Sequence, residues 1–228
     1  MKKVIVFDMD DTLYDEFEFV KSGFRAVSTF LNEQFGIIES ESYQWMWNRL
    51  QKQGRGAIFD DLLKEYGLYK KTLAKKCVSI YRLHKPTIQL PNETIEVLKQ
   101  LENFPLYLVT DGNKIVQNNK VQALELEKYM NKCFITYRYG LKHSKPSPHC
   151  FQLIAKQEKV EPEHIVYIGD NPSKDFVGIK PLGFRTIRIM TGQHVNKQLP
   201  EEFEADIRIQ YISELPNALK KLWPEIEV

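Results

Sequence analysis

The sequence is poor in cysteine. Its 228 residues include three, Cys77, Cys133 and Cys150, which are widely spaced and form no Cys-x-x-Cys pair. An odd number of isolated cysteines argues against the disulfide framework of small secreted proteins and gives no zinc-binding pattern. We therefore expect three reduced thiols that pack as small apolar side chains in a reducing compartment.

The sequence also lacks an excess of charge of one sign and any long apolar run. It has 32 Lys and Arg against 30 Asp and Glu, a formal charge of +2, and no block of five basic residues. This balance offers no electrostatic basis for binding a nucleic-acid polymer or an anionic membrane. The apolar run 4–7 stops at Asp8, and no stretch approaches the ~18 apolar residues of a membrane helix. We expect a cytoplasmic protein with a small-molecule partner, and the sequence leaves its oligomeric state open.

What is present is the pattern of an α/β protein. Five short runs rich in β-branched and aromatic residues predict buried parallel strands, at 3–7, 105–110, 133–136, 164–169 and 184–189. Helical patterns alternate with them, at 93–102, 114–124, 149–157, 174–180 and 212–222, with Asn92 and Ser173 as expected capping residues. The alternation predicts a Rossmann-like parallel sheet with helices on both of its faces.

One segment interrupts this alternation directly after the first predicted strand. Residues 16–84 show helical periodicity without a buried-strand signal, and the periodicity breaks at Gly36, at the run 54–56 and at Gly67. We interpret this segment as an all-helical domain inserted into the sheet domain. The α/β core then comprises residues 1–15 and 85–228, and the helical domain comprises residues 16–84.

Polar residues follow the predicted strands at their carboxyl ends, where sheets of this kind bind ligands. The residues are Asp8 and Asp10 after the first strand, Thr110 at the end of the second, Lys145 beyond the third, and Asp170 and Asp175 after the fourth. Several carboxylates at one point repel each other unless a cation lies among them. Hard oxygen ligands suit Mg²⁺, which usually also takes a substrate phosphate oxygen.

This combination of groups predicts phosphoryl transfer. One carboxylate can attack phosphorus and form an aspartyl-phosphate, and a second carboxylate two residues along can protonate the leaving oxygen and later deprotonate water. A lysine and a hydroxyl can offset the charge of the transferring group. Each short motif is common by itself, so the prediction depends on four elements in order, each at the end of a strand.

The motifs, from VIVFDMDDTLYDE through LVTDGN and KPSPHCF to YIGDNPSKDFVGIKPLGFRTI, resemble those of the haloacid dehalogenase-like (HAD) superfamily. The helical insertion looks like the C1 cap of that family. The resemblance implies that Asp8 is the nucleophile and a Mg²⁺ ligand. It implies that Asp10 is the general acid/base and binds Mg²⁺ through its backbone carbonyl. Thr110 and Lys145 would contact the phosphoryl group.

The resemblance also implies the remaining site residues. Asp170 would bind Mg²⁺, with Asp175 as a second ligand, directly or through water. The backbones of Met9, Asp10, Asp111 and Gly112 would cradle the phosphate. Asp111 stands where this family often has Asn, and the sequence leaves the direction of its side chain open.

Two features bear on the substrate. Dehalogenases and phosphonatases of this superfamily lack the second Asp of the first motif, so Asp10 implies phosphoryl transfer from oxygen. In capped relatives a loop near Arg55 projects over the active site, and Arg55 could bind an anionic or polar part of the substrate. A solvated turn is the alternative for this Arg between two glycines.

The resemblance therefore implies a Mg²⁺-dependent phosphatase that hydrolyses small phosphate monoesters, of the sugar phosphate or nucleoside monophosphate class, through an aspartyl-phosphate. The expected partner is a small phosphorylated metabolite. Two alternatives stay open: a phosphomutase of the same family, and a catalytically idle HAD fold that serves as a binding or regulatory protein. Idle members usually lose a residue equivalent to Asp8, Asp10 or Lys145, and this sequence retains all three.

Overall fold

The computed structural model describes residues 1–227 and divides the chain into two compact units. The first unit is formed by Met1–Glu16 together with the chain from Gln89 onward, and the second by Phe17–Ile88. The second unit thus begins one residue later and ends four residues later than the segment 16–84 expected from the sequence.

The first unit is built on a six-stranded parallel sheet with the strand order β3-β2-β1-β4-β5-β6. The strands are β1 (Val4–Phe7), β2 (Leu106–Thr110), β3 (Lys132–Ile135), β4 (Ile165–Gly169), β5 (Arg185–Ile189) and β6 (Ile207–Ile209). From β1 the chain moves outward to β2 and β3, and then crosses to β4 on the other side of β1. The carboxyl ends of β1 and β4 therefore flank a topological switch point, where sheets of this type bind ligands.

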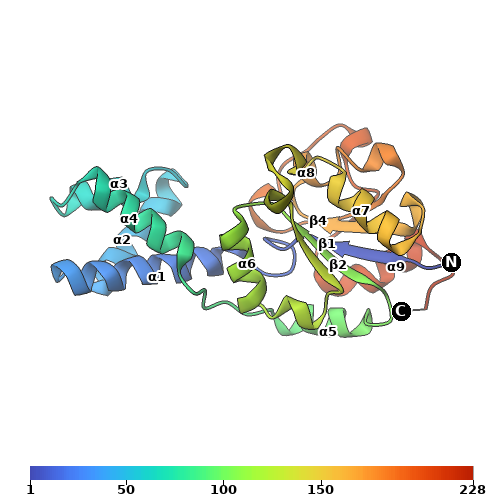
Figure 1. The fold of residues 1–228 in the computed structure, drawn as a ribbon, viewed down its shortest axis with the longest axis horizontal. Helices are drawn as coiled ribbons and strands as arrows, with labels where there is room; N and C mark the ends of the chain where they lie inside the picture. Colours follow the sequence, from blue (N-terminus) through green and yellow to red (C-terminus); the bar gives the residue numbers. More distant parts are fainter. Residues whose placement is uncertain (228) are drawn as a thin grey trace. The chain divides into compact units, whose positions relative to one another are not determined.

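Helices cover both faces of this sheet, as the sequence predicted. They are α5 (Asn92–Gln100), α6 (Lys114–Ala123), α7 (His149–Glu158), α8 (Pro172–Asp175) and α9 (Leu215–Leu222). Figure 1 shows α5 and α7 on opposite sides of the strands. On the α7 side, Phe151 and Ile154 pack against Val6, Val109 and Tyr167, and all five side chains are almost fully buried. Short 3-10 turns lie at Leu126–Lys128, Thr136–Tyr139, Leu141–His143, Pro162–His164, Lys180–Leu182, Gly192–His194, Glu201–Phe203 and Ile212–Glu214.

Local details differ from the sequence prediction at three places. The predicted helix 174–180 is wrong, because α8 ends after one turn and Phe176 and Ile179 pack into the core. The cap of α8 is Asn171, whose side chain accepts the backbone N–H of Ser173, and Asn92 lies inside α5 instead of capping it. Strand β6 was not predicted, since three residues at a sheet edge, of which only Ile209 is buried, carry little apolar signal.

The second unit is all-helical. Its helices are α1 (Glu16–Phe35), α2 (Glu39–Gln53), α3 (Ile58–Glu65) and α4 (Lys71–Leu83). The first residue of α1, Glu16, belongs to the first unit. Gly36, Gly54 and Gly67 follow the first three helices with φ of 69°, 71° and 65°, a left-handed conformation that favours glycine at helix ends. These are the positions at which the sequence periodicity breaks. Trp45 and Trp47 are partly buried and pack against the apolar core of this unit.

The three cysteines are present as thiols, as expected from the sequence. Cys77, Cys133 and Cys150 are all free, and the first and last of them are buried. Burial raises the pKa of the Cys77 thiol to about 11, so it behaves as an inert apolar group. Within residues 1–227, no helix combines the length and apolarity needed to span a membrane.

Candidate active site

A cavity of about 180 Å³ lies at the carboxyl ends of the strands in the first unit. All the residues predicted to be catalytic or metal-binding line it: Asp8, Asp10, Thr110, Lys145, Asp170 and Asp175. Asp8 follows β1, Thr110 ends β2 and Asp170 follows β4, so the sheet itself brings these side chains together. Asp111 also lines the cavity, whereas the side chain of Met9 is fully buried and Arg55 lies in the second unit.

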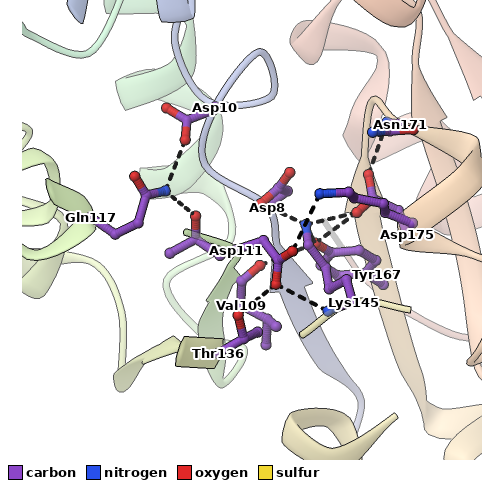
Figure 2. Close-up of polar contacts among 12 residues, drawn as sticks. Asp8, Asp10, Val109, Asp111, Gln117, Thr136, Lys145, Tyr167, Asn171 and Asp175 are labelled. Carbon is purple, nitrogen blue, oxygen red and sulfur yellow. Dashed lines mark hydrogen bonds and ion pairs between the residues drawn. The ribbon is translucent and has the colours of Figure 1, made fainter. Parts of the chain in front are cut away.

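Lys145 lies at the centre of the polar contacts in this cavity (Figure 2). Its Nζ is 3.0 Å from Asp8 Oδ1 and 2.7 Å from Asp175 Oδ1, and it donates to Tyr167 Oη at 2.9 Å. Burial by itself lowers the pKa of Lys145, but attraction from Asp175 and Asp8 outweighs it and raises the pKa well above its usual value. Lys145 therefore remains a fixed positive charge beside Asp8.

Three buried carboxylates, Asp8, Asp170 and Asp175, each offer an oxygen within 4.8 Å of the others. Burial, followed by repulsion from neighbouring carboxylates, raises the pKa of Asp8 to about 7 and that of Asp170 to about 9, although Lys145 opposes both shifts. Such a cluster ionises fully only when further positive charge is added. Its all-oxygen donor set fits a hard cation such as Mg²⁺.

The two oxygens of Asp175 already have partners within the protein. Oδ1 faces Lys145, and Oδ2 accepts the backbone N–H of Asn171 at 2.9 Å. A Cβ added to Gly169 would lie 2.4 Å from Asp175 Oδ2, so a glycine at this position leaves room for the carboxylate. In this arrangement Asp175 orients Lys145.

Asp10 is bound by three donors on the opposite side of the cavity from Lys145. Tyr14 Oη donates to Oδ1 at 2.6 Å, Lys120 Nζ donates to Oδ1 at 2.7 Å, and Gln117 Nε2 donates to Oδ2 at 2.9 Å. Burial raises the pKa of Asp10, but the ion pair with Lys120 and these hydrogen bonds outweigh it and lower the pKa below its usual value. Asp8 and Asp10 are two residues apart, yet their environments move their pKa values in opposite directions.

The side chain of Asp111 is directed toward the loop that carries Lys145 (Figure 2). Its Oδ1 accepts from Thr136 Oγ1 at 2.5 Å and from the backbone N–H of Lys145 at 3.0 Å. Lys174 Nζ lies 3.4 Å from Oδ2. The carboxylate that stands where the family often has Asn thus braces the Lys145 loop.

The same loop packs tightly against the chain that follows α8. A Cβ added to Gly178 would lie 1.6 Å from the carbonyl oxygen of Pro146, far inside the closest approach of two non-bonded heavy atoms, so the backbone would have to move. Glycine at 178 therefore allows a close backbone contact that supports the position of Lys145.

Four residues that contact the predicted catalytic groups were not predicted from the sequence: Tyr14, Gln117, Lys120 and Tyr167. A signal for two of them was present. Gln117, Lys120 and Val121 are spaced i, i+3, i+4 along α6, which is the spacing of a core-facing stripe. Polar residues at such positions indicate a buried polar contact and not a solvated face.

Comparisons with known proteins agree with this geometry. A family model for haloacid dehalogenase-like hydrolases matches residues 2–183. The chain is 31% identical to a glyceraldehyde 3-phosphate phosphatase from Methanocaldococcus jannaschii, over 97% of this chain and 99% of that protein. It is 28% identical to a glyceraldehyde 3-phosphate phosphatase from Pyrococcus furiosus, over 96% and 92% of the two chains. Its fold is similar to that of a 2-haloacid dehalogenase from Pseudomonas syringae pv. tomato, with a TM-score of 0.65 and 24% identity over 97% and 99% of the chains.

The parallel sheet, the acidic cavity at its strand ends and the family match define the class of the protein. The chain belongs to the haloacid dehalogenase-like hydrolase family. Within that family it is an enzyme of the phosphatase type.

Proposed function

We propose that this enzyme hydrolyses small phosphate monoesters with Mg²⁺ as cofactor, through an aspartyl-phosphate on Asp8. The observation that carries the proposal is the single cavity that Asp8 and Asp10 share with Lys145 and with the carboxylate cluster. The proposal combines a nucleophile, an acid/base, a fixed positive charge and a cation site, which are the groups that phosphoryl transfer requires.

The donor set supports Mg²⁺ as the cofactor. Asp8 and Asp170 are the carboxylates that would hold the ion together with the backbone carbonyl of Asp10, and Asp175 would contribute through water because its own oxygens already have partners. When bound, Mg²⁺ neutralises the carboxylates and polarises a phosphate oxygen. The positions of the carboxylates support this assignment, since Asp8, Asp170 and Asp175 each offer an oxygen within 4.8 Å of the others. Burial first, and repulsion between these groups second, raise the pKa of Asp8 and of Asp170.

The chemistry assigned to the protein's own residues has two steps. In the first, a carboxylate oxygen of Asp8 attacks phosphorus and the ester oxygen leaves as an alcohol with a proton from Asp10. Because its partners favour the carboxylate in the free protein, Asp10 must take up this proton when the dianionic substrate binds beside it. In the second, Asp10 takes a proton from water, which attacks the phosphorus of phospho-Asp8 and releases inorganic phosphate. Lys145 and Thr110 would stabilise the charge on the transferring group, helped by the backbone N–H groups of the loops that follow β1 and β2.

For the substrate, we favour a small sugar phosphate over a nucleoside monophosphate. The names of the two archaeal relatives support this choice, since both are glyceraldehyde 3-phosphate phosphatases. The cavity of about 180 Å³ suits a phosphoryl group with a short carbon chain. Arg55, in the second unit, remains our candidate for binding a polar or anionic part of the substrate.

The test is release of inorganic phosphate from a panel of sugar phosphates and nucleoside monophosphates, with and without Mg²⁺. We expect turnover that depends on Mg²⁺ and that falls by at least ~10³-fold in Asp8→Asn, because an amide is a very poor nucleophile. A surface variant such as Asp15→Asn serves as the control. Asp8→Asn with near-normal turnover would refute the assigned nucleophile. Phosphate release only in the presence of a sugar bisphosphate would indicate a mutase instead.

A further inference from the structure

Helix α6 buries two polar side chains that the mechanism above does not use. Lys120 and Gln117 are only 2% and 3% exposed, although both belong to residue types that usually lie at the surface. They are three residues apart and therefore lie on the same side of the helix. A buried ammonium group is unfavourable unless a negative group compensates it.

The compensating group is the carboxylate of Asp10. Lys120 Nζ lies 2.7 Å from Asp10 Oδ1, and it also lies 3.5 Å from Glu16 Oε1 at the start of α1. Gln117 Nε2 donates to the other oxygen, Oδ2, at 2.9 Å. Since α6 binds both oxygens of Asp10, the plane of the carboxylate is held as well as its position.

Gln117 makes a second contact that connects Asp10 to the phosphate-binding side of the cavity. The same Nε2 donates to Thr110 Oγ1 at 2.7 Å, so one amide group bridges Asp10, in the loop after β1, and Thr110, the last residue of β2 (Figure 2 shows its bond to Asp10). Thr110 and Asp10 are proposed to act on the same phosphoryl group. An ion pair that served stability alone would not need this bridge between two groups of the reaction.

We propose that Lys120 and Gln117 are positioning residues, which hold the Asp10 carboxylate in the orientation for proton transfer to the leaving oxygen and from water. This inference rests on the proposed role of Asp10 as general acid/base. Small displacements of a proton-transfer group reduce rates strongly, since transfer requires hydrogen-bond distance to the reacting oxygen. The proposal therefore predicts that removal of either residue reduces the rate most in the steps that need a proton.

Two substrates separate these steps. An alkyl phosphate has a strongly basic leaving oxygen that needs the proton from Asp10, whereas 4-nitrophenolate leaves without one. The ratio kcat/KM reports the steps through formation of the phosphoenzyme. It should be measured for 4-nitrophenyl phosphate and for the best alkyl phosphate from the substrate panel. The variant Asp10→Asn shows how far the losses on the two substrates differ when the general acid is absent.

For Lys120→Met and for Gln117→Met, we expect kcat/KM on the alkyl phosphate to fall by about 10- to 100-fold, part of the 10²- to 10⁴-fold that a general acid supplies. On 4-nitrophenyl phosphate we expect Lys120→Met to lose less than about threefold, because no proton is needed. Gln117→Met also removes the hydrogen bond to Thr110 Oγ1, so it should lose activity on both substrates, with a loss at least about fivefold larger on the alkyl phosphate. Lys120→Arg should recover most of the activity, since it restores a cation beside Asp10. Lys114→Met is the matched control, an exposed lysine on the same helix.

The comparison distinguishes failure of this inference from failure of the proposed function. Equal losses on both substrates in Lys120→Met and Gln117→Met would assign the two residues a structural role only, and losses no larger than those of Lys114→Met would assign them none. If Asp10→Asn itself shows no preference between the substrates, the acid/base role of Asp10 is wrong. The ratio between substrates is measured on the same protein sample, so partial unfolding of a variant does not alter it.

Discussion

The contact between Lys145 and Asp175 permits a quantitative test of how burial changes the coupling free energy of an ion pair. Their N···O distance is 2.7 Å, and the two side chains are 3% and 0% exposed. The chain contains a natural comparison in Lys128 and Glu125, which are 2.5 Å apart but 64% and 62% exposed. Both pairs join a lysine to a carboxylate at short distance, but the first is buried and the second is exposed. Lys145 also contacts Asp8, and the double-mutant cycle separates the Lys145–Asp175 coupling from that contact.

The expected magnitudes follow from Coulomb's law. At an effective dielectric constant of 20, two unit charges 2.7 Å apart attract by about 6 kcal/mol, whereas full solvation reduces the attraction at 2.5 Å to under about 2 kcal/mol. Desolvation offsets much of the first figure, and side-chain entropy and salt offset most of the second. We therefore expect a coupling energy of about 3 kcal/mol for the buried pair and less than about 0.5 kcal/mol for the exposed pair.

Double-mutant cycles measure these couplings directly. The variants are Lys145→Met, Asp175→Asn and their combination, with Lys128→Met, Glu125→Gln and their combination as the matched control. Urea unfolding is followed by circular dichroism in EDTA, and amide exchange in β1 and β4 reports the stability of the first unit separately. Lys145→Met should lower the free energy of unfolding, because it leaves Asp175 buried without its partner. The double variant Lys145→Met/Asp175→Asn should recover much of that free energy. Coupling energies that are equal within error for the two pairs would refute the reasoning.

Two further predictions concern the metal and the Lys145 loop. If Asp8 and Asp170 hold Mg²⁺ as proposed, the ion must displace protons from groups whose pKa values are raised to about 7 and about 9, so its affinity should increase with pH. Titration calorimetry should show the dissociation constant falling roughly tenfold per pH unit from 7 to 9, more steeply below pH 8 than above it, and a constant affinity would contradict this. Gly178→Ala should destabilise the protein by about 3 kcal/mol or more in urea unfolding, because its Cβ would meet the carbonyl oxygen of Pro146. Gly56→Ala, whose Cβ meets open space, should change stability by less than about 0.5 kcal/mol.

Most of the fold was predictable because buried parallel strands appear in a sequence as continuous apolar runs. Strands β1, β2 and β4 follow this rule, and every residue in them is buried. Strands β3 and β5 were also predicted, although each contains at least one charged residue. Strand β6 was not, since its short alternating sequence Ile207-Arg208-Ile209 lies at the sheet edge. The early end of α8 was also not predictable, because it depends on the packing of Phe176 and Ile179 against distant strands.

The residues of the candidate site likewise include some that were predictable from the sequence and some that were not. Asp8, Asp10, Thr110 and Asp170 were predictable because each lies at or directly after the end of a strand, and parallel strands bring these ends to one edge. For Lys120 the spacing along α6 indicates a buried position, but it does not identify the partner of the ammonium group. Only the packing of α6 against the loop after β1 buries it beside a carboxylate.

By itself, the sequence determined the order of strands and helices, the edge of the sheet where polar groups gather, and the type of chemistry that those groups permit. These properties depend on residue type and spacing, which are local. The tertiary structure decided which atoms pair and therefore which groups are charged: Asp175 faces Lys145, Asp111 braces the loop of Lys145, and Asp10 is held by α6. The physical reason is that the energy of a polar contact depends on burial and on distances of a few tenths of an ångström between residues far apart in the chain.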